Sequence, residues 1–455
     1  MSKATCSTKQ TSGDLAWWQL SLIGIGCTIG IGFFLGSSLG VKLTGASIIV
    51  SFLIGAAGTY IVYSRLAKMT IHDPQESSFC YYANKAFGKW AGFSCGWNYW
   101  CSNILIMGSQ LTALGLLSQF WFPDVPLWIF SAGYAVLAIF VVMLGTKGFD
   151  KMEDLFAIIK VAAILMFIVI ALGIYFGWIK GGGADAGAGS SPGNFPNTIK
   201  EWMPMGLKGL WSSLIYAFYA YGGIEVIGLM AMQLKKKDDT LKAGSIMIGL
   251  LMILYVGSLG LAVSLAAFEM FNEKESPFVT ALTNYDLAFF PHVFNGAIII
   301  AGFSTMTAAL FGVTTLLVTL AKDGDAPKLF QKKIKFRELP LPSLLLGVGG
   351  LVASVICAFV LPGKVFEYAT TAAGLLLLYN WIFILLSSFR LEKKGKLLSA
   401  VGLLLLLVAI SGTLVEKTVR NGFFISILFV GLIATVTLIM QRKWKKGGGK
   451  KLKYS

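Results

Sequence analysis

The chain has 455 residues, of which 56% are hydrophobic and only 13% are charged. Soluble globular domains carry about 25% charged residues, so this composition excludes a soluble multi-domain enzyme and indicates a membrane protein. The formal net charge of +16 would suit nucleic acid binding in a soluble protein, but the positions of the charges described below indicate a membrane surface instead.

Residues 1–16 are polar and precede a first apolar stretch that is too long for the hydrophobic region of a secretory signal. We therefore expect a cytoplasmic N-terminus and a first helix that is retained. Apolar stretches then recur, each close to the roughly 20 residues that cross a bilayer as a helix. They predict an all-α membrane protein with 12 transmembrane helices, at residues 17–39, 45–67, 91–119, 127–145, 155–177, 205–231, 242–268, 289–320, 342–361, 366–388, 397–414 and 421–440.

Positive charge is unevenly divided between the segments that connect these spans. If both termini are cytoplasmic, the inner segments hold 29 of the 38 lysines and arginines, the outer segments hold eight, and Lys160 lies inside a span. Cytoplasmic segments are enriched in Lys and Arg, which anionic lipid attracts. We therefore expect a multi-pass protein of the plasma membrane with both termini cytoplasmic and no nucleic acid partner.

Five glycines interrupt the first span, at positions 24, 26, 30, 32 and 36. Each costs about 1 kcal/mol relative to alanine, so the helix is weakest there. One interpretation is close helix packing through small residues. The other is an unwound segment whose backbone N–H groups bind an anion. That segment would comprise Thr28, Ile29, Gly30, Ile31 and Gly32.

Lys160 lies about two turns into the fifth span. A charge costs about 2.5–3.5 kcal/mol inside a membrane helix, so its presence there indicates a function. A buried ammonium can take up and release a proton in each cycle. The alternatives are an ion pair with Glu225 and extension of the lysine side chain to the nearby interface.

The segment 180–204 begins with a Gly- and Ser-rich string and predicts a flexible external linker. It separates a first unit of five spans, residues 17–179, from a second unit of five, residues 205–390. Residues 391–440 hold the last two spans, and residues 441–455 form a basic cytoplasmic tail that we expect to contact anionic lipid.

The sixth span is also interrupted near its middle. The interruption consists of Tyr219, Ala220, Tyr221, Gly222 and Gly223, followed by the charged Glu225. Two glycine-interrupted helices at corresponding positions of two halves indicate the binding site of an inverted-repeat transporter. Irregular backbone at that depth must line a protein-walled or wet cavity. Glu225 is then either a functional charge or a hydrogen-bonded helix cap.

The eighth span carries three short hydroxyl side chains, Ser304, Thr305 and Thr307. They are candidate ligands for sodium or hydrogen-bond acceptors for a lysine ammonium, but such residues also pack membrane helices, so both interpretations stay open. The six cysteines form no CxxC pair. We therefore expect free thiols, and no metal site or cofactor.

Four motifs resemble those of the amino acid permeases of the amino acid-polyamine-organocation superfamily, and the resemblance runs through the first ten spans. The motifs are Thr28 to Phe34, similar to the family's IGxGxF element; Gly145 to Lys160, similar to its GxKxFxxxE stretch and following lysine; Phe218 to Glu225, similar to its FFAFxGxE element; and Leu320 to Pro327, similar to its LAxDGxxP loop. The chain departs from the family pattern at Lys68, Ser77, Gln233 and Thr315.

The resemblance implies a LeuT-like 5+5 inverted repeat with two extra C-terminal helices. It implies that amides around Thr28 to Gly32 hold an amino acid carboxylate, and that carbonyls of Tyr219, Ala220 and Gly222 hold its ammonium. Lys160 matches the lysine that occupies the sodium position in proton-coupled members. Tyr219 matches an aromatic that covers the substrate, and Glu225 matches a carboxylate of conformational coupling.

These inferences predict a secondary active transporter, not an enzyme, that imports a neutral amino acid by alternating access with proton symport. Lys160 and Glu225 are the expected proton-coupling residues. The alternatives are an amino acid exchanger or a sodium symporter of the same fold, and a transporter-like nutrient sensor.

Overall fold

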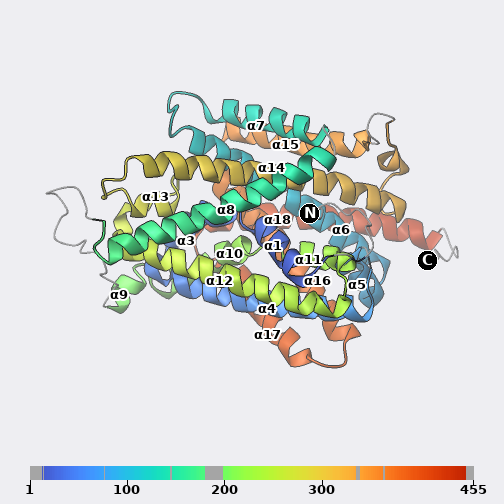
Figure 1. The fold of residues 1–455 in the computed structure, drawn as a ribbon. Coiled ribbons are helices and arrows are strands. Elements are labelled where there is room, and N and C mark those ends of the chain that lie inside the picture. The colour runs from blue at the N-terminus through green and yellow to red at the C-terminus, as the bar shows by residue number, and fades with distance from the viewer. Residues whose placement is uncertain are drawn as a thin grey trace.

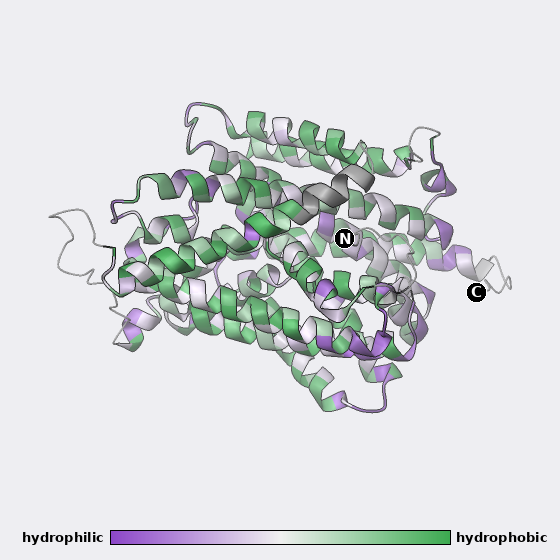
Figure 2. Cartoon of the chain, in the orientation of Figure 1, coloured by the Kyte–Doolittle hydropathy of each residue, from purple (hydrophilic) through white to green (hydrophobic). Residues whose placement is uncertain are grey.

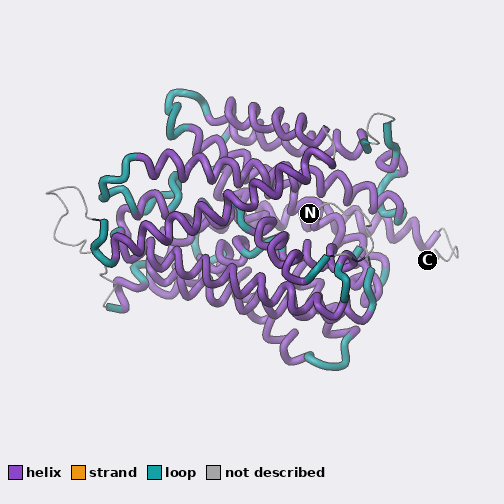
Figure 3. Tube along the Cα trace, viewed as in Figure 1, coloured by secondary structure: helices purple, strands orange, loops and turns teal. Residues whose placement is uncertain are grey.

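The computed structural model describes residues 13, 15–75, 77–143, 146–179, 198–334, 339–361 and 364–446. The regular elements in these ranges are helices, joined by short loops (Figure 3). One isolated bridge pairs Leu15 with Leu234. Most of the predicted linker and tail, and the side chains of residues 144–154, lie outside the described residues.

The helices follow one another in this order: α1 (Trp17–Thr28), α2 (Ile31–Phe34), α3 (Gly36–Thr44), η1 (Gly45–Ser47), α4 (Ile48–His72), α5 (Ser78–Phe87), α6 (Lys89–Ser118), α7 (Leu127–Met143), α8 (Thr146–Tyr175), α9 (Ile199–Trp202), α10 (Gly206–Ala220), α11 (Ile224–Met230), η2 (Ala231–Gln233), η3 (Lys237–Asp239), α12 (Thr240–Leu265), η4 (Phe268–Met270), α13 (Pro277–Ala281), α14 (Phe289–Lys322), η5 (Lys328–Gln331), α15 (Leu341–Val360), α16 (Val365–Leu391), α17 (Lys396–Gly412) and α18 (Lys417–Lys446).

Eight helical stretches in the described ranges are long and apolar enough to cross a membrane. They are Ile31–His72, Lys89–Ser118, Leu155–Tyr175, Lys237–Leu265, Phe289–Lys322, Leu341–Val360, Val365–Leu391 and Lys417–Trp444. Two shorter apolar helices are Leu127–Met143 and Lys396–Gly412. A described helix lies in each of the twelve predicted stretches, while membrane crossing by all twelve stays a prediction.

The outer helices are rich in hydrophobic residues, which are coloured green in Figure 2, and several of their apolar side chains are exposed. Phe140 of α7, Val169 of α8 and Leu428 of α18 are 60%, 68% and 70% exposed. Water would penalise such surfaces, whereas lipid tails do not. The chain is therefore a multi-pass membrane protein.

The interrupted helices lie inside the bundle (Figure 1). Helix α6 packs against α14 and α16, and α4 packs against α10 and α12. The last two helices lie outside this core, because α17 packs on α16, α10 and α4, and α18 packs on α16 and α6. The longer helices named above enclose the short helices α1, α2, α10 and α11. Irregular backbone in a membrane requires such enclosure by protein.

The cysteines follow the expectation only in part. Cys80, Cys95, Cys101 and Cys357 are free, whereas Cys27 is disulfide-bonded. The prediction of free thiols is therefore wrong at Cys27. Single cysteines without a motif carry no pairing signal, so the sequence offered no way to identify this one.

Candidate functional site

The first predicted interruption is present but shorter than predicted, because Thr28, Ile31 and Gly32 are helical. Helix α1 ends at Thr28, and α2 begins at Ile31. Between them Ile29 has φ −67° and ψ 113°, and Gly30 has φ −155° and ψ −167°, both in the extended region. The chain therefore leaves the helix for two residues in the middle of a buried segment.

The second predicted interruption is also present and also shorter than predicted, because Tyr219 and Ala220 still belong to a helix. Helix α10 ends at Ala220, a turn occupies residues 221–223, and α11 begins at Ile224. Gly223 has φ +112°, a conformation that side-chain-bearing residues rarely adopt. Glycine at this position therefore allows the turn.

The two interruptions touch each other. A Cβ atom placed on Gly223 would lie 3.2 Å from Thr28 Oγ1, and one placed on Gly32 would lie 2.8 Å from the Tyr219 ring. Alanine at Gly32 would therefore require the ring to move. The glycines let the backbone of one interrupted helix approach the other closely. Both interpretations of the glycines in the first span, close helix packing and an unwound segment, therefore apply.

Backbone N–H and C=O groups at these interruptions can make further hydrogen bonds. In the described part of the chain, the amides of Gly30, Ile31 and Gly32 donate no backbone hydrogen bond. The Tyr219 carbonyl accepts the Gly222 N–H at 2.9 Å, and the Ala220 carbonyl accepts the Tyr255 hydroxyl at 3.3 Å. Since a carbonyl oxygen has two lone pairs, each of these can accept another donor.

A cavity of about 570 Å³ lies between the two interruptions. This volume falls in the range of small-molecule sites. Of the predicted site residues, those that line it are Thr28, Gly30, Gly32, Tyr219, Ala220, Gly222, Gly223, Glu225 and Thr305. The side chains of Ile29, Ile31 and Tyr221 pack into the hydrophobic core instead.

Three further helices complete the cavity wall. Asn103, Ile106 and Gln110 come from α6, Thr305, Ala308, Ala309 and Gly312 from α14, and Leu377 from α16. Gln110 Nε2 donates to Thr305 Oγ1 at 2.9 Å, which joins α6 to α14 across the wall. Gln110 was not predicted from the sequence, although an amide inside an apolar span was a usable signal, because buried polar groups in membranes need partners.

The cavity extends from the interruptions toward one end of the bundle only. There its lining includes Gln75 and Tyr81 near the α4–α5 turn, and Asp323 and Asp325 after α14. On the other side of the interruptions a buried aromatic cluster fills the space. Phe33 stacks on Tyr255 with ring centroids 3.8 Å apart, and Phe278 lies 5.3 Å from Phe33.

Lys160 connects α8 to the first interruption. Its Nζ donates to the Gly26 carbonyl at 3.0 Å, and the residue is 1% exposed. Extension of the side chain to the interface is therefore wrong in this structure. The ion pairs of the described residues do not include the expected alternative, a pair between Lys160 and Glu225. The proton-coupling role of Lys160 stays a prediction.

Glu225 serves as a cap at the second interruption. Its Oε2 accepts the Gly223 N–H at 3.3 Å, and the residue is 4% exposed while lining the cavity. The carboxylate therefore stabilises the turn before α11, as the helix-cap interpretation expected. Its part in proton coupling stays a prediction.

The three hydroxyls of α14 have different surroundings. Thr305 lines the cavity, accepts from Gln110 and donates to the Ala301 carbonyl at 3.1 Å. Thr307 donates within its own helix, to the Phe303 carbonyl at 2.8 Å. Ser304 Oγ is buried without a hydrogen-bond partner in the described part of the chain. The structure therefore brings only Thr305 of these three to the cavity.

Two ionic contacts lie at the open end of the cavity. Lys89 Nζ lies 3.6 Å from Asp325 Oδ1, and burial raises the pKa of the Asp325 carboxyl to about 6. Lys85 Nζ contacts Asp73 Oδ2 at 2.5 Å, and this hydrogen bond lowers the pKa of Asp73. These carboxylates were not among the predicted site residues.

Comparison with known proteins gives one consistent relationship. The profile of the family described as "Amino acid permease" matches residues 19–441. The uncharacterized transporter YcgH of Bacillus subtilis is 52% identical over 95% of this chain and 96% of its own length. The aromatic amino acid transport protein AroP of Corynebacterium glutamicum is 30% identical over 83% of this chain and 81% of its own. The gamma-aminobutyric acid permease of Bacillus subtilis is 25% identical over 95% and 93%.

Proposed function

Since this chain belongs to the amino acid permease family, we propose that it imports a neutral amino acid across the plasma membrane by alternating access, with proton symport. It is a transporter, not an enzyme. The observation that carries the proposal is the contact between two interrupted helices beside one cavity. Among the described residues, amides of the first interruption donate no backbone hydrogen bond, and Tyr219 and Ala220, just before the second interruption, line the cavity.

This arrangement suits a zwitterion. Amides at Gly30, Ile31 and Gly32 attract a carboxylate, because N–H groups at an unwound helix carry partial positive charge. The Tyr219 and Ala220 carbonyls attract an ammonium for the opposite reason. Both groups belong to every amino acid, so the backbone recognises the class and leaves the choice of side chain to the cavity wall.

The wall favours a neutral side chain. Ile106, Ala308, Ala309 and Leu377 are apolar, and Gln110 is occupied by Thr305. Glu225 is engaged with the backbone of its own turn. A lysine or arginine substrate would find no unengaged carboxylate among these residues, and burying an unpaired charge is costly. The relative AroP is named for aromatic amino acids, which are neutral substrates of this kind.

The one-sided cavity supports alternating access. The aromatic cluster around Phe33 and Tyr255 closes one end, while the other end reaches the segments that carry most of the positive charge. Under the positive-inside rule that end is cytoplasmic. We infer an inward-facing state of a 12-helix, LeuT-like 5+5 repeat, in which closure at the Gln75 and Asp325 end would accompany opening of the aromatic cluster.

Proton coupling is assigned to Lys160. Its ammonium donates to the carbonyl of Gly26, which lies in α1 three residues before the interruption begins at Ile29. A change in protonation at this nitrogen would alter the contact between α8 and α1. Protonation of Lys160 would therefore directly influence the position of the backbone that binds the substrate.

The test is uptake of radiolabelled amino acids into proteoliposomes under an imposed pH gradient, with and without sodium. We expect gradient-driven uptake that needs no sodium and that Lys160→Ala removes, while the exposed Lys200→Ala keeps it. Uptake that ignores both the gradient and Lys160→Ala would exclude proton symport. Uptake that occurs only when the proteoliposomes are preloaded with amino acid would indicate an exchanger. Uptake that requires sodium would indicate a sodium symporter.

A further inference from the structure

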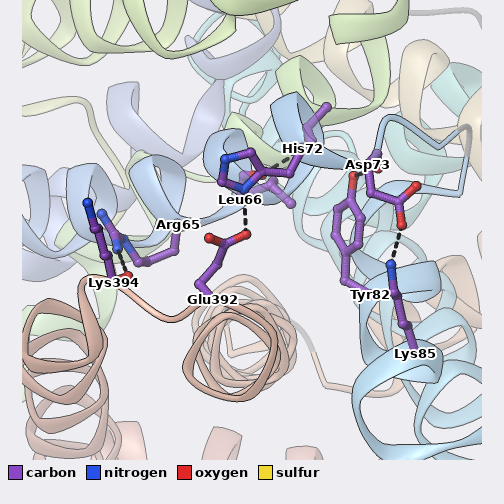
Figure 4. A network of polar contacts seen from close by, with 9 residues as sticks. Arg65, Leu66, His72, Asp73, Tyr82, Lys85, Glu392 and Lys394 are labelled. Carbon is purple, nitrogen blue, oxygen red and sulfur yellow. Dashed lines mark hydrogen bonds and ion pairs between the residues drawn. The ribbon is translucent and has the colours of Figure 1, made fainter.

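A second cavity, of about 760 Å³, lies at the end of α4, beside α5 and the segment that joins α16 to α17 (Figure 4). It is separate from the candidate transport site. Its lining combines Lys68, Met69, Ile71, His72, Asp73, Tyr82, Lys85, Leu241, Leu391, Glu392, Lys393 and Lys394. Four lysines and His72 outnumber the two carboxylates, Asp73 and Glu392, in this set.

Pairing inside the cavity leaves an excess of positive charge. Lys85 neutralises Asp73 at 2.5 Å, and His72 Nδ1 lies 2.9 Å from Glu392 Oε1. Both carboxylates of the lining are therefore engaged. In the described part of the chain the remaining lysines, Lys68, Lys393 and Lys394, make no ion pair. Three like charges around one hollow repel each other, and a bound anion would relieve this repulsion.

A buried guanidinium adds to this charge. Arg65, one turn before Lys68 on α4, is 2% exposed. Its Nη1 donates to the Lys394 carbonyl at 3.4 Å, and its Nε has no hydrogen-bond partner among the described residues. Gly395 packs directly against it, with φ +86° and no room for a Cβ. Glu392, which pairs with His72, also interacts electrostatically with Arg65, so one carboxylate is shared by two basic side chains and the local excess of positive charge remains.

We propose that this cavity binds a phosphate-bearing anion, supplied by the headgroup of an anionic phospholipid. Lysine ammonium groups bind phosphate as compact point charges. The site lies where α4 ends at His72 and α16 ends at Leu391, at the level of the expected cytoplasmic headgroups. Exposed apolar side chains of Phe389 and Leu397 flank the segment and offer a surface to acyl chains.

The bound anion would also act on the transport cavity, because the two cavities share a wall. Gln75 and Tyr81 line the first cavity, while Asp73 and Lys85, in the same α4–α5 region, line the second. Tyr81 and Gln75 both donate to Asp73, at 3.2 and 3.0 Å. An anion that joins Lys68 to Lys393 and Lys394 would fix the end of α4 beside this wall and stabilise the observed conformation.

The experiment compares two triple variants that remove equal charge from the same end of the molecule. Lys68→Gln, Lys393→Gln and Lys394→Gln change the cavity, whereas Lys322→Gln, Lys328→Gln and Lys332→Gln change exposed lysines outside it. The melting temperature of each purified protein is titrated with phosphatidylglycerol or phosphatidylcholine in mixed micelles. The same titration is made with inorganic phosphate and with glycerol 3-phosphate, which are soluble phosphates without acyl chains. A Lys→Arg version of the cavity triple keeps the charge and serves as the conservative variant.

We expect phosphatidylglycerol, but not phosphatidylcholine, to raise the melting temperature of the parent, the control triple and the Arg triple. The Gln cavity triple should bind phosphatidylglycerol about a hundredfold more weakly, or about 3 kcal/mol, at roughly 1 kcal/mol per lysine. Equal responses of both Gln triples would overturn the site. A response to soluble phosphate as strong as that to lipid would retain the phosphate site but overturn the lipid as its source.

Discussion

Gly223 shows how a single residue determines the candidate site. Its φ is +112°, and a Cβ atom at this position would lie 3.2 Å from Thr28 Oγ1, so a larger residue would strain the backbone and press against Thr28. Leucine there would force the turn out of the left-handed region, at about 1–2 kcal/mol before any clash. Because the Tyr219 and Ala220 carbonyls would then move, we expect substrate affinity to fall by at least about tenfold.

This prediction is tested by thermal-shift titration with the twenty amino acids. Gly249→Leu is the matched control, since a Cβ at Gly249 of α12 meets no atom within 4 Å. Unchanged affinity in Gly223→Leu, together with a normal melting temperature, would count against the interrupted helices as the binding element.

Asp325 gives a prediction about pH. Burial raises its pKa from 3.8 to about 6, so the folded protein binds more protons at this residue than the unfolded chain between those values. Stability from this group is therefore present at low pH and is lost as pH rises from about 4 to 6. Asp325→Asn should raise the free energy of unfolding at pH 7.5, by at most about 3 kcal/mol, and change it little near pH 4.

Melting curves of the purified variant at several pH values would measure this difference. The exposed Asp124→Asn serves as the control and should show no such pH-dependent gain. A gain of equal size at both pH values would mean that the loss of the Lys89 contact or a packing change, not the titration of Asp325, is responsible.

Among the helices, α2 and α12 hold the closed end of the cavity through Phe33 and Tyr255. Phe33 is fully buried and stacks on Tyr255 at 3.8 Å. Removing a buried phenylalanine costs about 3–5 kcal/mol. Phe33→Ala should therefore lower the melting temperature clearly, whereas Phe140→Ala, on the lipid-facing side of α7, should have a small effect.

The Phe33→Ala variant also tests whether the aromatic cluster closes this end of the cavity. If Phe33 helps to close this end, Phe33→Ala should make the cavity reachable from the outside, and a cysteine in place of Thr305 should become reactive toward an external impermeant thiol reagent. A destabilised Phe33→Ala protein in which that cysteine stays protected would show that the ring serves packing alone.

How far the sequence predicts these elements depends on the signal each one carries. Glycine clusters identified both interruptions, because glycine weakens a helix wherever it stands. The wall residues Asn103, Gln110 and Ala308 were not identified, because an apolar span reveals its length but not which side faces the cavity. That rotation is set by packing of α6 and α14 against their neighbours, which depends on residues far apart in the chain.

For the whole molecule, the sequence predicted the membrane class and the helix ranges from hydropathy and charge. It did not predict that Phe33, Tyr255 and Phe278 would meet, or that residues near 73 and 392 would enclose a basic cavity. Both depend on helices that are distant in sequence. Local composition therefore determines where the helices lie along the chain, while tertiary packing determines which end of the cavity is open.

Orientation is the remaining whole-molecule property, and it follows from charge. The segment 322–332 carries several lysines on the open side, whereas Lys274 lies in the exposed loop before α13 on the side of the aromatic cluster. With positive charge retained inside, a cysteine at Lys332 should be labelled by an impermeant maleimide only from the cytoplasmic side. A cysteine at Lys274 should be labelled only from outside, in intact cells. The free cysteines are first replaced by serine, and that unlabelled background is the control. The reverse pattern would invert the topology and turn the observed conformation into an outward-facing one.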